Sequence, residues 1–420
     1  MRIMKNLCLA FLFLCFTIQT FGQDVTIESI YFVGNKKTKT SFLESLIKAE
    51  AGQKLDSLLI EKDMEQLKRM PSIGHAYYQV EYINPTQVKI KYGVHERFTL
   101  LPEFNLWSSK GRTWYKVGAH EYNFLGENMA IGGYYQYSGK PSYGINFRAP
   151  YLFSNKMGMS ANFSNWESEE PLYFNENVAQ YDYKNTAIEA VGIYEPNFSH
   201  KIEFGGSFFN EKYTFISSAK VDTTLPRGLN INKVLLKSYY QWYNIKQHYQ
   251  YQDGFSNDLS AQAVFSRYED FLILNNDFKF FARVRKKGNI AMRLRVGVGS
   301  NADSPFSPFV IDNHENVRGV GDRINRGTAT LTFNVEYRHT LLDNDLLIVQ
   351  GAGFSDYSTL REPALNLDEL FQDENLYATA GLGLRFTVKK IYGAVLRIDY
   401  GKGLNPRSGE GFVFGLGQYF

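Results

Sequence analysis

The chain has 420 residues, enough for one large domain and a small one. Its mean hydropathy of −0.32 excludes a bundle of membrane helices, and its net charge of +3 gives no argument for nucleic-acid binding. Aromatic residues make up 16% of the chain, and glycines (35) far outnumber prolines (12). This composition is typical of a large antiparallel β structure.

Residues 1–22 have the pattern of a secretory signal segment. Arg2 and Lys5 supply a positive start, and the apolar run that follows is too short to span a bilayer. Both cysteines of the chain lie here, at Cys8 and Cys15, so the exported chain is expected to have no disulfide and no thiol chemistry. A lipoprotein anchored at Cys15 is the alternative. Removal of the segment leaves 44 basic and 43 acidic residues, a net charge of +1.

The next part, residues 23–96, follows a β-α-α-β-β order. Thr40 or Ser41 can cap a first helix, and Asp56 or Ser57 can cap a second one. The alternation and the helical periodicity predict strands and helices in this order: a strand at Val25–Val33, helical faces at Phe42–Ile47 and Ile60–Leu67, and strands at His75–Ile83 and Gln87–Val94.

The first of these strands leads into a short motif, Ile30–Thr38, which contains Gly34, Asn35 and Thr38. With the β-α-α-β-β order, this motif resembles the start of a POTRA domain, the periplasmic module of outer-membrane assembly factors. The resemblance implies that residues 23–96 lie in the periplasm and receive clients or a partner by strand pairing. An unrelated small α+β domain is the alternative.

Residues 97–420 lose the helical period and alternate instead. Sixteen segments of roughly ten residues predict a sixteen-stranded antiparallel transmembrane β-barrel. The strands are expected to begin near Phe98, Arg112, Asn128, Ser142, Met157, Tyr181, Lys201, Asn232, Asp258, Asp277, Ile290, Gly327, Leu346, Leu376, Tyr392 and Gly411. Connections after even strands are short, whereas several after odd strands are long: 166–180, 218–231, 300–326 and 356–375. This pattern is typical of an outer-membrane barrel whose first and last strands both end on the periplasmic side. A soluble sandwich is the alternative.

Strand twelve makes the face assignment testable. One set of alternate residues is apolar and is expected to face lipid: Ala329, Leu331, Phe333, Val335 and Tyr337. The other set is polar and is expected to face the lumen: Thr330, Thr332, Asn334, Glu336 and Arg338. The same alternation in strands eleven and fifteen turns four charged residues inward: Arg293, Arg295, Arg397 and Asp399.

The closing strand is predicted at Gly411–Phe420. Its aromatic end and apolar residues at every second position resemble the terminal signal of outer-membrane barrels. Gly411, Gly415 and Gly417 are expected on its lumen side, and Phe420 at its end. The glycines leave little side-chain packing, so the seam with the first strand is a candidate for lateral opening and strand addition. Ordinary closure, as in a porin, is the alternative.

The most unusual stretch is Val317–Gly327, which holds three arginines and three glycines in eleven residues. Glycines at such spacing indicate special backbone angles. Arginines indicate fixed partners, because the guanidinium is always charged and presents a rigid fork of donors. A flexible cationic surface hairpin is the alternative.

In strand order this stretch belongs to the sixth outer loop. Its segment Val317-Arg318-Gly319-Val320 resembles the Val/Leu-Arg-Gly-Phe/Tyr motif of the superfamily that includes BamA, TamA and the two-partner-secretion transporters. Val320 stands where that motif has an aromatic residue. The resemblance implies that the loop folds back into the barrel.

Two further positions match the same superfamily. The end of strand thirteen is expected at Phe354-Ser355-Asp356-Tyr357-Ser358. This segment resembles the superfamily's Phe/Gly-x-Asp-x-Gly motif, with Ser358 in place of glycine. Glu336 matches the superfamily's acidic residue on strand twelve. A lone buried charge is costly, so Arg318 is expected to pair with Glu336 and Asp356 through bidentate contacts. This pairing either shapes the lumen and the seam or only stabilises the barrel.

The resemblance implies a factor that inserts or translocates proteins at the outer membrane, without nucleotide, metal or other cofactor. Its expected partners are the outer-membrane bilayer, unfolded outer-membrane or secreted client proteins, and periplasmic or lipoprotein accessory proteins. A dedicated two-partner-type secretion pore and a passive channel without insertase activity are the alternatives.

No enzymatic activity and no catalytic residue are expected. The sequence has no nucleophile motif, and its seven histidines have no metal-ligand spacing: His75, His95, His120, His200, His248, His314 and His339. Trp166–Glu170, in a predicted outer loop, is expected to be a solvated acidic face rather than a metal site.

Overall fold

The computed structural model of the protein describes residues 25–420, except 110–111, 175–176, 198, 221, 249, 303, 305, 322, 364, 390 and 392–394. The predicted signal segment, residues 1–22, lies outside the described residues, as do Cys8 and Cys15. The chain separates into two compact units, one ending at Glu96 and the other beginning at Arg97. No helix among the described residues is long and apolar enough to cross a membrane.

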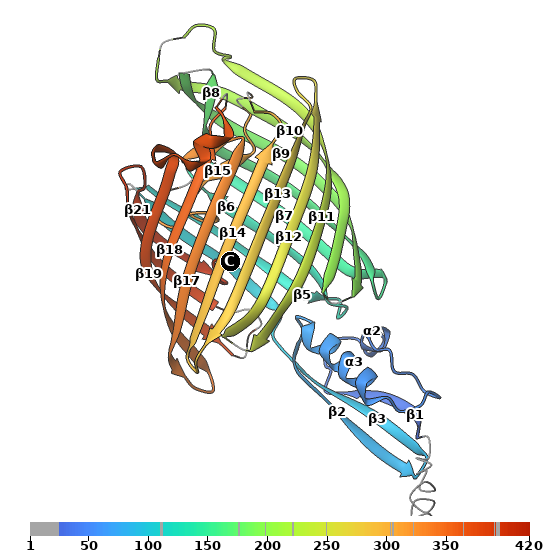
Figure 1. Ribbon diagram of the computed structural model, residues 1–420. Coiled ribbons are helices and arrows are strands. Elements are labelled where there is room, and N and C mark those ends of the chain that lie inside the picture. The colour runs from blue at the N-terminus through green and yellow to red at the C-terminus, as the bar shows by residue number, and fades with distance from the viewer. Residues whose placement is uncertain are drawn as a thin grey trace, which may run out of the picture. The chain divides into compact units, whose positions relative to one another are not determined.

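The unit that ends at Glu96 is a three-stranded sheet with two helices packed on it (Figure 1). Its elements, in chain order, are β1 (Thr26–Val33), α2 (Thr40–Leu46), α3 (Ser57–Arg69), β2 (Ile73–Asn84) and β3 (Gln87–Glu96). β3 is the central strand, with β1 parallel to it and β2 antiparallel. The predicted β-α-α-β-β order is therefore confirmed.

The two helices begin differently. The Asp56 carboxylate accepts hydrogen bonds from the backbone N–H groups of Leu58 and Leu59 and caps α3, as predicted. Helix α2 begins after Lys39 without a side-chain cap, so the predicted cap at Thr40 or Ser41 is wrong. The Thr40 hydroxyl instead accepts a hydrogen bond from the Asn35 amide.

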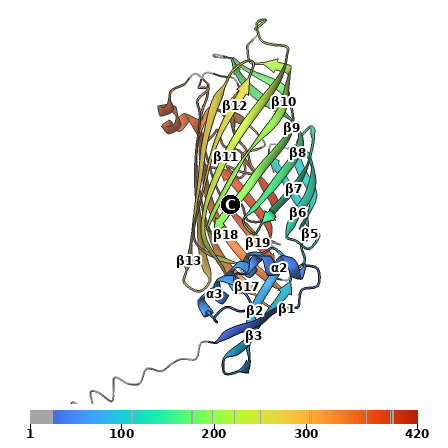
Figure 2. The same ribbon diagram turned by 90° about the vertical axis from the view of Figure 1, so that its right-hand side faces the viewer.

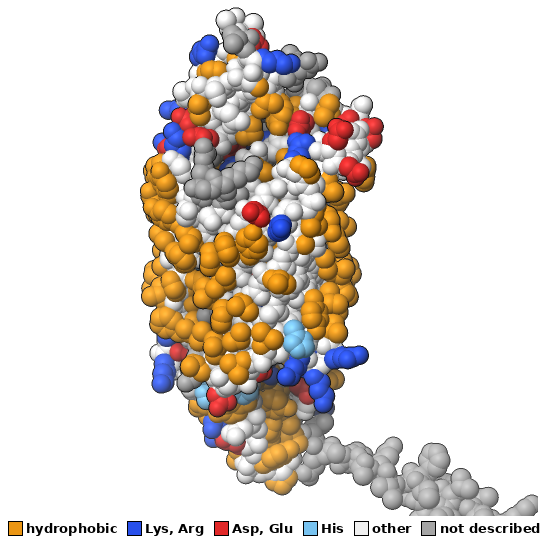
Figure 3. Space-filling model, turned by 90° about the vertical axis from the view of Figure 1, so that its left-hand side faces the viewer, with side chains coloured by type: hydrophobic (Ala, Val, Ile, Leu, Met, Phe, Trp, Pro, Cys, Tyr) orange, Lys and Arg blue, Asp and Glu red, His pale blue; other side chains and the backbone are white. Residues whose placement is uncertain are grey.

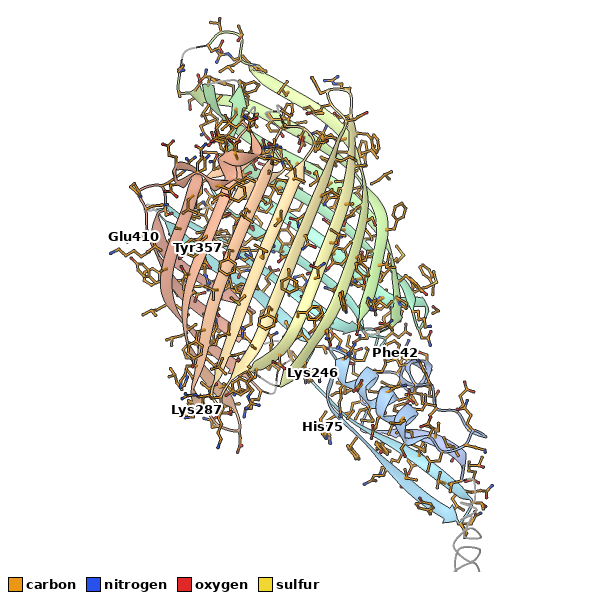
Figure 4. All side chains as sticks on the ribbon, in the orientation of Figure 1. Phe42, His75, Lys246, Lys287, Tyr357 and Glu410 are labelled. Atoms are coloured by element: carbon orange, nitrogen blue, oxygen red, sulfur yellow. The ribbon has the colours of Figure 1, made fainter. Side chains whose placement is uncertain are left out.

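Alternate residues of β3 form the core of this unit. These β3 residues are buried: Val88, Ile90, Tyr92 and Val94. The two helices cover them and contribute the buried side chains of Phe42 (labelled in Figure 4), Leu43, Ile60 and Leu67. The buried Asp63 carboxylate of α3 accepts hydrogen bonds from the Tyr92 hydroxyl at 3.1 Å and from the backbone N–H groups of Lys48 and Ala49. One carboxylate therefore links α3, the segment after α2 and the sheet.

The second unit is a closed barrel of sixteen strands, as predicted (Figures 1 and 2). In chain order the strands are β4 (Leu100–Ser109), β5 (Arg112–Phe124), β6 (Met129–Tyr137), β7 (Pro141–Ser154), β8 (Met157–Phe174), β9 (Asn177–Asn197), β10 (His200–Ser218), β11 (Gly228–His248), β12 (Tyr251–Ser266), β13 (Phe271–Val284), β14 (Gly288–Gly299), β17 (Ala329–Asp343), β18 (Leu347–Arg361), β19 (Leu376–Val388), β20 (Val395–Gly403) and β21 (Glu410–Leu416). Neighbouring strands are antiparallel throughout, and β21 pairs with β4 to close the ring.

The wall of the barrel is apolar outside and polar inside. On β17 the outward residues Phe333 and Tyr337 are exposed, whereas Thr332, Asn334, Glu336 and Arg338 on the inward face are buried. Figure 3 shows hydrophobic side chains gathered over the barrel wall, with most charged side chains toward its two ends. An even-stranded closed barrel with an apolar outer face is the architecture of bacterial outer-membrane proteins, so the protein lies in the outer membrane.

The two ends of the barrel differ in their connections. One end carries short turns, such as the turn at Lys287. Figure 4 labels Lys287 and also Lys246, which lies near the end of β11 at the same end of the barrel. The other end carries the longer connections, the longest of them between β14 and β17. Short turns face the periplasm in barrels of this kind. β4 starts from the short-turn end, so the unit that precedes it lies in the periplasm.

Five strands are much longer than the predicted ten residues. β8, β9, β10, β11 and β12 run for 18, 21, 19, 21 and 16 residues. The predicted outer loop at 166–180 is wrong, because most of it continues β8 and begins β9. A buried cluster links the ends of β8, β9, β10 and β11: Leu172, Ala179, Tyr181, Tyr183, Tyr213, Leu225 and Ile231. Burying these side chains favours continued pairing above the membrane.

The closing strand is shorter than predicted. β21 ends at Leu416, so Gly411 and Gly415 lie on its lumen side but Gly417 and Phe420 lie outside it. Gly417 adopts a φ of +92°, which an extended strand does not allow. The chain therefore leaves the barrel wall at this glycine.

Candidate functional site

The sixth outer loop, residues 300–328, enters the lumen of the barrel. It contains two short paired strands, β15 (Phe309–Ile311) and β16 (Asn325–Gly327). Val317 and Val320 are fully buried with Ile311, Leu360 and Tyr377 in one apolar cluster. Val320, which replaces the aromatic residue of the motif, is thus an apolar anchor of the loop against β18 and β19.

Arg318 makes the densest set of contacts in this loop. Its side chain is 0% exposed. Nη1 donates to Glu336 at 2.6 Å, and Nε and Nη2 donate to the two oxygens of Asp356 at 2.8 and 2.9 Å. A third carboxylate, Asp399 of β20, lies 3.5 Å from Nη1. The structure thus brings together the three residues that the motifs single out, Arg318, Glu336 and Asp356, and adds Asp399.

Other arginines surround the same carboxylates. Arg385 of β19 bridges Glu336 at 2.9 Å and Asp399 at 2.6 Å, and Arg338 of β17 donates to Glu336 at 2.7 Å. All of these side chains are buried. Burial of so many charges is tolerable only when each has an opposite charge and good hydrogen-bond geometry. We call Arg318 with Glu336, Asp356 and Asp399 the Arg318 lock.

The second motif lies inside a strand. Phe354 and Asp356 are in the middle of β18, so their predicted position at a strand end is wrong; Tyr357, labelled in Figure 4, marks the place. Alternation explains the arrangement, because Phe354, Asp356 and Ser358 all face the lumen. The Phe354 ring centre lies 3.5 Å from the Arg318 guanidinium carbon. Ser358, which replaces glycine in the motif, forms a 2.6 Å hydrogen bond with Thr332 of β17.

Gly319 allows the loop to lie directly on the barrel wall. Its φ is +98°, and a Cβ placed there would lie 2.6 Å from the carbonyl oxygen of Gly401 on β20. A Cβ on Gly401 would in turn lie 2.3 Å from the Arg318 carbonyl oxygen. Two glycines therefore let the loop backbone and the strand backbone touch, which brings Arg318 within reach of its carboxylates.

The outer half of the loop has its own buried ion pairs. Glu170 of β8 is 0% exposed and contacts Arg323 at 2.6 Å and Arg326 at 2.5 Å. Arg326 also donates two hydrogen bonds to the Ser307 carbonyl oxygen. The predicted solvated acidic face at Trp166–Glu170 is therefore wrong for Glu170, because β8 turns this side chain toward the loop. We call Glu170 with Arg323 and Arg326 the outer clamp.

The loop does not fill the lumen completely. A cavity of about 460 Å³ remains between the loop and strands β4, β6 and β8–β11. Trp107, Trp166 and Phe209 line it together with Asp312 and Glu315. The His314 ring stacks on Trp107 with 5.6 Å between ring centres. The cavity is bounded by a loop that two sets of ion pairs hold in place.

The predicted POTRA signature residues shape a turn in the periplasmic unit. Gly34 has a φ of +91°, and a Cβ there would lie 2.2 Å from the Val94 carbonyl oxygen. The Asn35 amide donates to the Thr38 carbonyl oxygen at 2.9 Å. The backbone N–H groups of Lys37 and Thr38 donate to the Glu96 carboxylate. These residues fix the connection between β1 and α2.

Metal ligands do not cluster in the described part of the chain, where no group of three or more His, Cys, Asp or Glu residues could hold an ion. Two histidines do meet across β2 and β3. His75 and His95 are paired in register, with 6.0 Å between ring centres. Sequence spacing alone does not reveal this pair.

Several site residues escaped the sequence analysis. Arg385 lies at an inward position of an alternating strand, so the pattern of β19 could have revealed it. Glu170 could not be found in that way, because Arg323 and Arg326 are far away in sequence and Glu170 lies in no recognised motif. Tyr419 lies at an inward position of the predicted closing strand, but its contact with Arg318 could not be predicted from the alternation. Tyr419 lies over Arg318, with 4.3 Å from its ring centre to the guanidinium carbon.

Comparisons with known proteins agree with this fold. The POTRA family, described as "Surface antigen variable number repeat", matches residues 25–97. A search of curated proteins by sequence finds no match.

Three solved structures resemble most of the chain. BamA from Haemophilus ducreyi lacking POTRA domains 1–3 has 15% identity and a TM-score of 0.60, covering 93% of this chain and 84% of that one. CdiB from Acinetobacter baumannii has 12% identity and a TM-score of 0.60, covering 94% and 74%. CdiB from Escherichia coli has 10% identity and a TM-score of 0.64, covering 94% and 76%.

At these identities the likeness to solved structures establishes the fold. Together with the family match on residues 25–97, it confirms the resemblance drawn from the motifs. The chain combines a POTRA domain with a sixteen-stranded outer-membrane barrel, and it has the fold of the superfamily that includes BamA, TamA and the two-partner-secretion transporters.

Proposed function

We propose that this protein inserts or translocates polypeptides at the outer membrane, using the POTRA domain and the seam between β21 and β4. Residues 1–22 would direct export, residues 23–96 would form the periplasmic domain and residues 97–420 the barrel. The observation that carries the proposal is the short seam. Among the described residues, β21 pairs with β4 only from Gly411 to Gly415.

The other ladders of the barrel are longer. Each of them runs over seven or more paired positions within the described residues. Two of the five seam positions on β21 are glycines, which offer no side chain to pack across the seam. A short ladder with few side-chain pairs is the place where the ring opens most easily. An opened strand edge is a template for another strand.

The POTRA domain offers a second place for strand pairing. Its sheet order, β1-β3-β2, leaves β1 and β2 as the two outer strands. Sheet edges of this kind bind extended peptides through main-chain hydrogen bonds. In this proposal the domain receives an unfolded outer-membrane or secreted client, or a periplasmic or lipoprotein accessory protein, and passes a strand to the seam.

The locked loop favours the lateral route over transport of a client through the lumen. Loop six crosses the lumen with a fully buried Arg318 and a fully buried Glu170. A client moving through the lumen, as in a dedicated secretion pore, would first have to separate these ion pairs. Lateral release through the seam requires only the short ladder to open.

Three measurements on the purified protein in liposomes distinguish the three functions. The first follows the folding rate of an unfolded outer-membrane client, the second follows entry of a soluble client into the vesicle, and the third records single-channel conductance. Faster client folding supports insertion, and transfer of a soluble client into the vesicle supports a secretion pore. Conductance without either effect supports a passive channel and contradicts the proposal. Empty liposomes and liposomes with an unrelated porin are the controls.

A further inference from the structure

Two histidines face each other on the exposed side of the POTRA sheet. His75 of β2, labelled in Figure 4, and His95 of β3 are directly opposite in the antiparallel ladder, and both side chains are exposed. Residues opposite each other in such a ladder have Cβ atoms about 4.5–5.5 Å apart. Here the ring centres are 6.0 Å apart. Two imidazoles therefore lie side by side at the surface of the domain.

A β-bulge turns His75 to this side of the sheet. Ile73 and Ala76 are both buried, although residues three apart in a regular strand point to opposite faces. The ladder shifts its register between Ile73 and His75, which leaves Gly74 as the extra residue. Regular alternation counted from Ile73 would bury His75. The bulge instead brings this histidine out beside His95.

Tyr77 forms a wall next to the two imidazoles. Its ring centre lies 6.2 Å from that of His75 and 6.0 Å from that of His95. The Tyr77 ring lies across Gly93, where an added Cβ would be only 2.2 Å from it. A ring held in this place restricts the rotamers that the two histidines can adopt. The restriction lowers the entropy cost of bringing both imidazoles onto one ligand.

Neither imidazole is engaged elsewhere. Within the described residues, His75 and His95 take part in no hydrogen bond or ion pair. The neighbouring Glu96 carboxylate is already held by the backbone N–H groups of Lys37 and Thr38. The imidazole nitrogens are therefore the donors that remain at this place. Neutral imidazole is the commonest metal ligand in proteins and suits copper, nickel and zinc.

We propose that His75 and His95 form a binding site for a divalent transition-metal cation of the copper, nickel and zinc type. Two nitrogens on one such cation lie roughly 3–4 Å apart, because each metal–nitrogen bond is about 2.0–2.1 Å long. Exposed rings with centres 6.0 Å apart reach this spacing by side-chain rotation alone. Two protein ligands leave the other coordination positions to water or to a ligand from another molecule.

A bound cation would join β2 to β3. The unfolded chain does not hold the two imidazoles together, so metal binding favours the paired ladder. The population in which this ladder is open falls by the factor 1 + [metal]/Kd. At a free metal concentration ten times Kd, amides of β2 and β3 that exchange through this opening should therefore exchange about tenfold more slowly.

Calorimetric titration of the full-length protein in detergent, purified with a tag that contains no histidine, tests the site. Copper(II) and zinc(II) salts are the two probes. We expect one cation per chain and tighter binding of copper than of zinc. His75→Asn and His95→Asn are each expected to weaken binding at least about tenfold. The electron paramagnetic resonance spectrum of bound copper should show two coupled imidazole nitrogens in the parent protein.

His339 of β17 provides the matched control. It is exposed and has a tyrosine beside it, Tyr337, with 6.1 Å between ring centres. The residues opposite it are Gly288 and Gly351, so no second imidazole faces it. His339→Asn is therefore expected to leave the affinity for both metals within about twofold of the parent value.

Two outcomes would overturn the inference. One is equal metal affinity in the parent protein and in the double variant His75→Asn/His95→Asn. The other is hydrogen exchange of β2 and β3 amides that the metal slows no more in the parent than in the double variant. Neither measurement uses a client, so failure of the metal site and failure of the proposed function are distinguishable.

Discussion

Arg318 and Asp356 are joined by three hydrogen bonds. The Arg318 backbone N–H donates to Asp356 at 3.1 Å, and Nε and Nη2 donate to the same carboxylate at 2.8 and 2.9 Å. The contact therefore fixes the loop backbone as well as the guanidinium.

The first prediction concerns this pair. Arg318→Ala leaves the buried Asp356 carboxylate without its arginine, and is expected to lower the free energy of unfolding by about 3–5 kcal/mol. Asp356→Ala leaves Arg318 with Glu336 and Asp399, so its expected loss is smaller. The double variant is expected to lose no more than the worse single one, because it removes both charges. Urea titration in detergent, followed by tryptophan fluorescence, measures the three losses.

An exposed pair provides the control for that cycle. Lys184 and Glu167 are 2.6 Å apart and partly exposed, so their alanine variants are expected to change stability by less than about 1 kcal/mol. Additive losses for Arg318 and Asp356 would argue against their pairing.

The second prediction concerns the outer clamp. Glu170→Gln removes the charge that Arg323 and Arg326 share, so the outer half of loop six should open more often. Trypsin cleavage after these arginines in the folded protein is expected to rise at least about tenfold. Glu169→Gln makes the same charge change on an exposed side chain and should have little effect. Equal cleavage in the two variants would contradict the clamp.

The third prediction compares two glycines of the POTRA domain. Gly34 and Gly52 have nearly the same φ, +91° and +90°, but only Gly34 has backbone within reach of an added Cβ. Gly52→Ala should therefore lose only the cost of a left-handed backbone, about 1–2 kcal/mol. Gly34→Ala should lose about 1–3 kcal/mol more, because β1 and β3 must separate. Hydrogen exchange of β1 and β3 amides in the full-length protein measures the difference, and equal losses would refute it.

The fourth prediction is a pH dependence of the POTRA domain. Burial disfavours the charged Glu96, but hydrogen bonds from Thr38 and Lys37 outweigh it and hold the pKa of this carboxyl below its ordinary value. The stabilisation that charged Glu96 gives the folded domain is therefore complete above the ordinary glutamate pKa of about 4.3. It is lost as the pH falls through that value toward the lowered pKa.

Amide hydrogen exchange between pH 7 and pH 3, corrected for intrinsic exchange rates, tests whether the domain loses stability as the pH falls. Protection of the Lys37 and Thr38 amides should fall over the acidic part of this range. Glu96→Gln should be less protected at pH 7 and should lose most of the dependence. An identical pH profile in the variant would exclude Glu96 as the cause.

Alternation in the sequence is sufficient to predict the barrel and part of the lock. On β17, every second residue is polar, which turns Glu336 inward before any contact is known. An always-charged arginine in the loop that enters the lumen then needs a carboxylate, and Glu336 and Asp356 are the inward ones that the motifs mark. Alternation and charge pairing narrow the possible partners of Arg318, and the resemblance to the superfamily motifs selects Glu336 and Asp356.

The outer clamp could not be predicted in the same way. Glu170 lies in a stretch whose charges and aromatic residues look like a solvent loop. Its burial depends on β8–β11 continuing above the membrane, and that depends on a cluster formed by several strands. Residues Gly417–Phe420 have a similar explanation. Their alternation favours a strand, but contacts of Tyr419 with Arg318 of the sixth loop and Arg397 of β20 hold them in the lumen.

The proposed function requires the seam between β21 and β4 to open to a client. Ser108→Cys with Phe412→Cys would lock β4 to β21, and Ile398→Cys with Phe414→Cys would lock β20 to β21 as a matched control. Folding of an unfolded outer-membrane client in liposomes is measured with each pair oxidised and then reduced. The seam disulfide is expected to abolish the acceleration of client folding, reduction is expected to restore it, and the control disulfide is expected to have no effect. Acceleration that is unchanged with the seam disulfide formed would contradict opening of the seam.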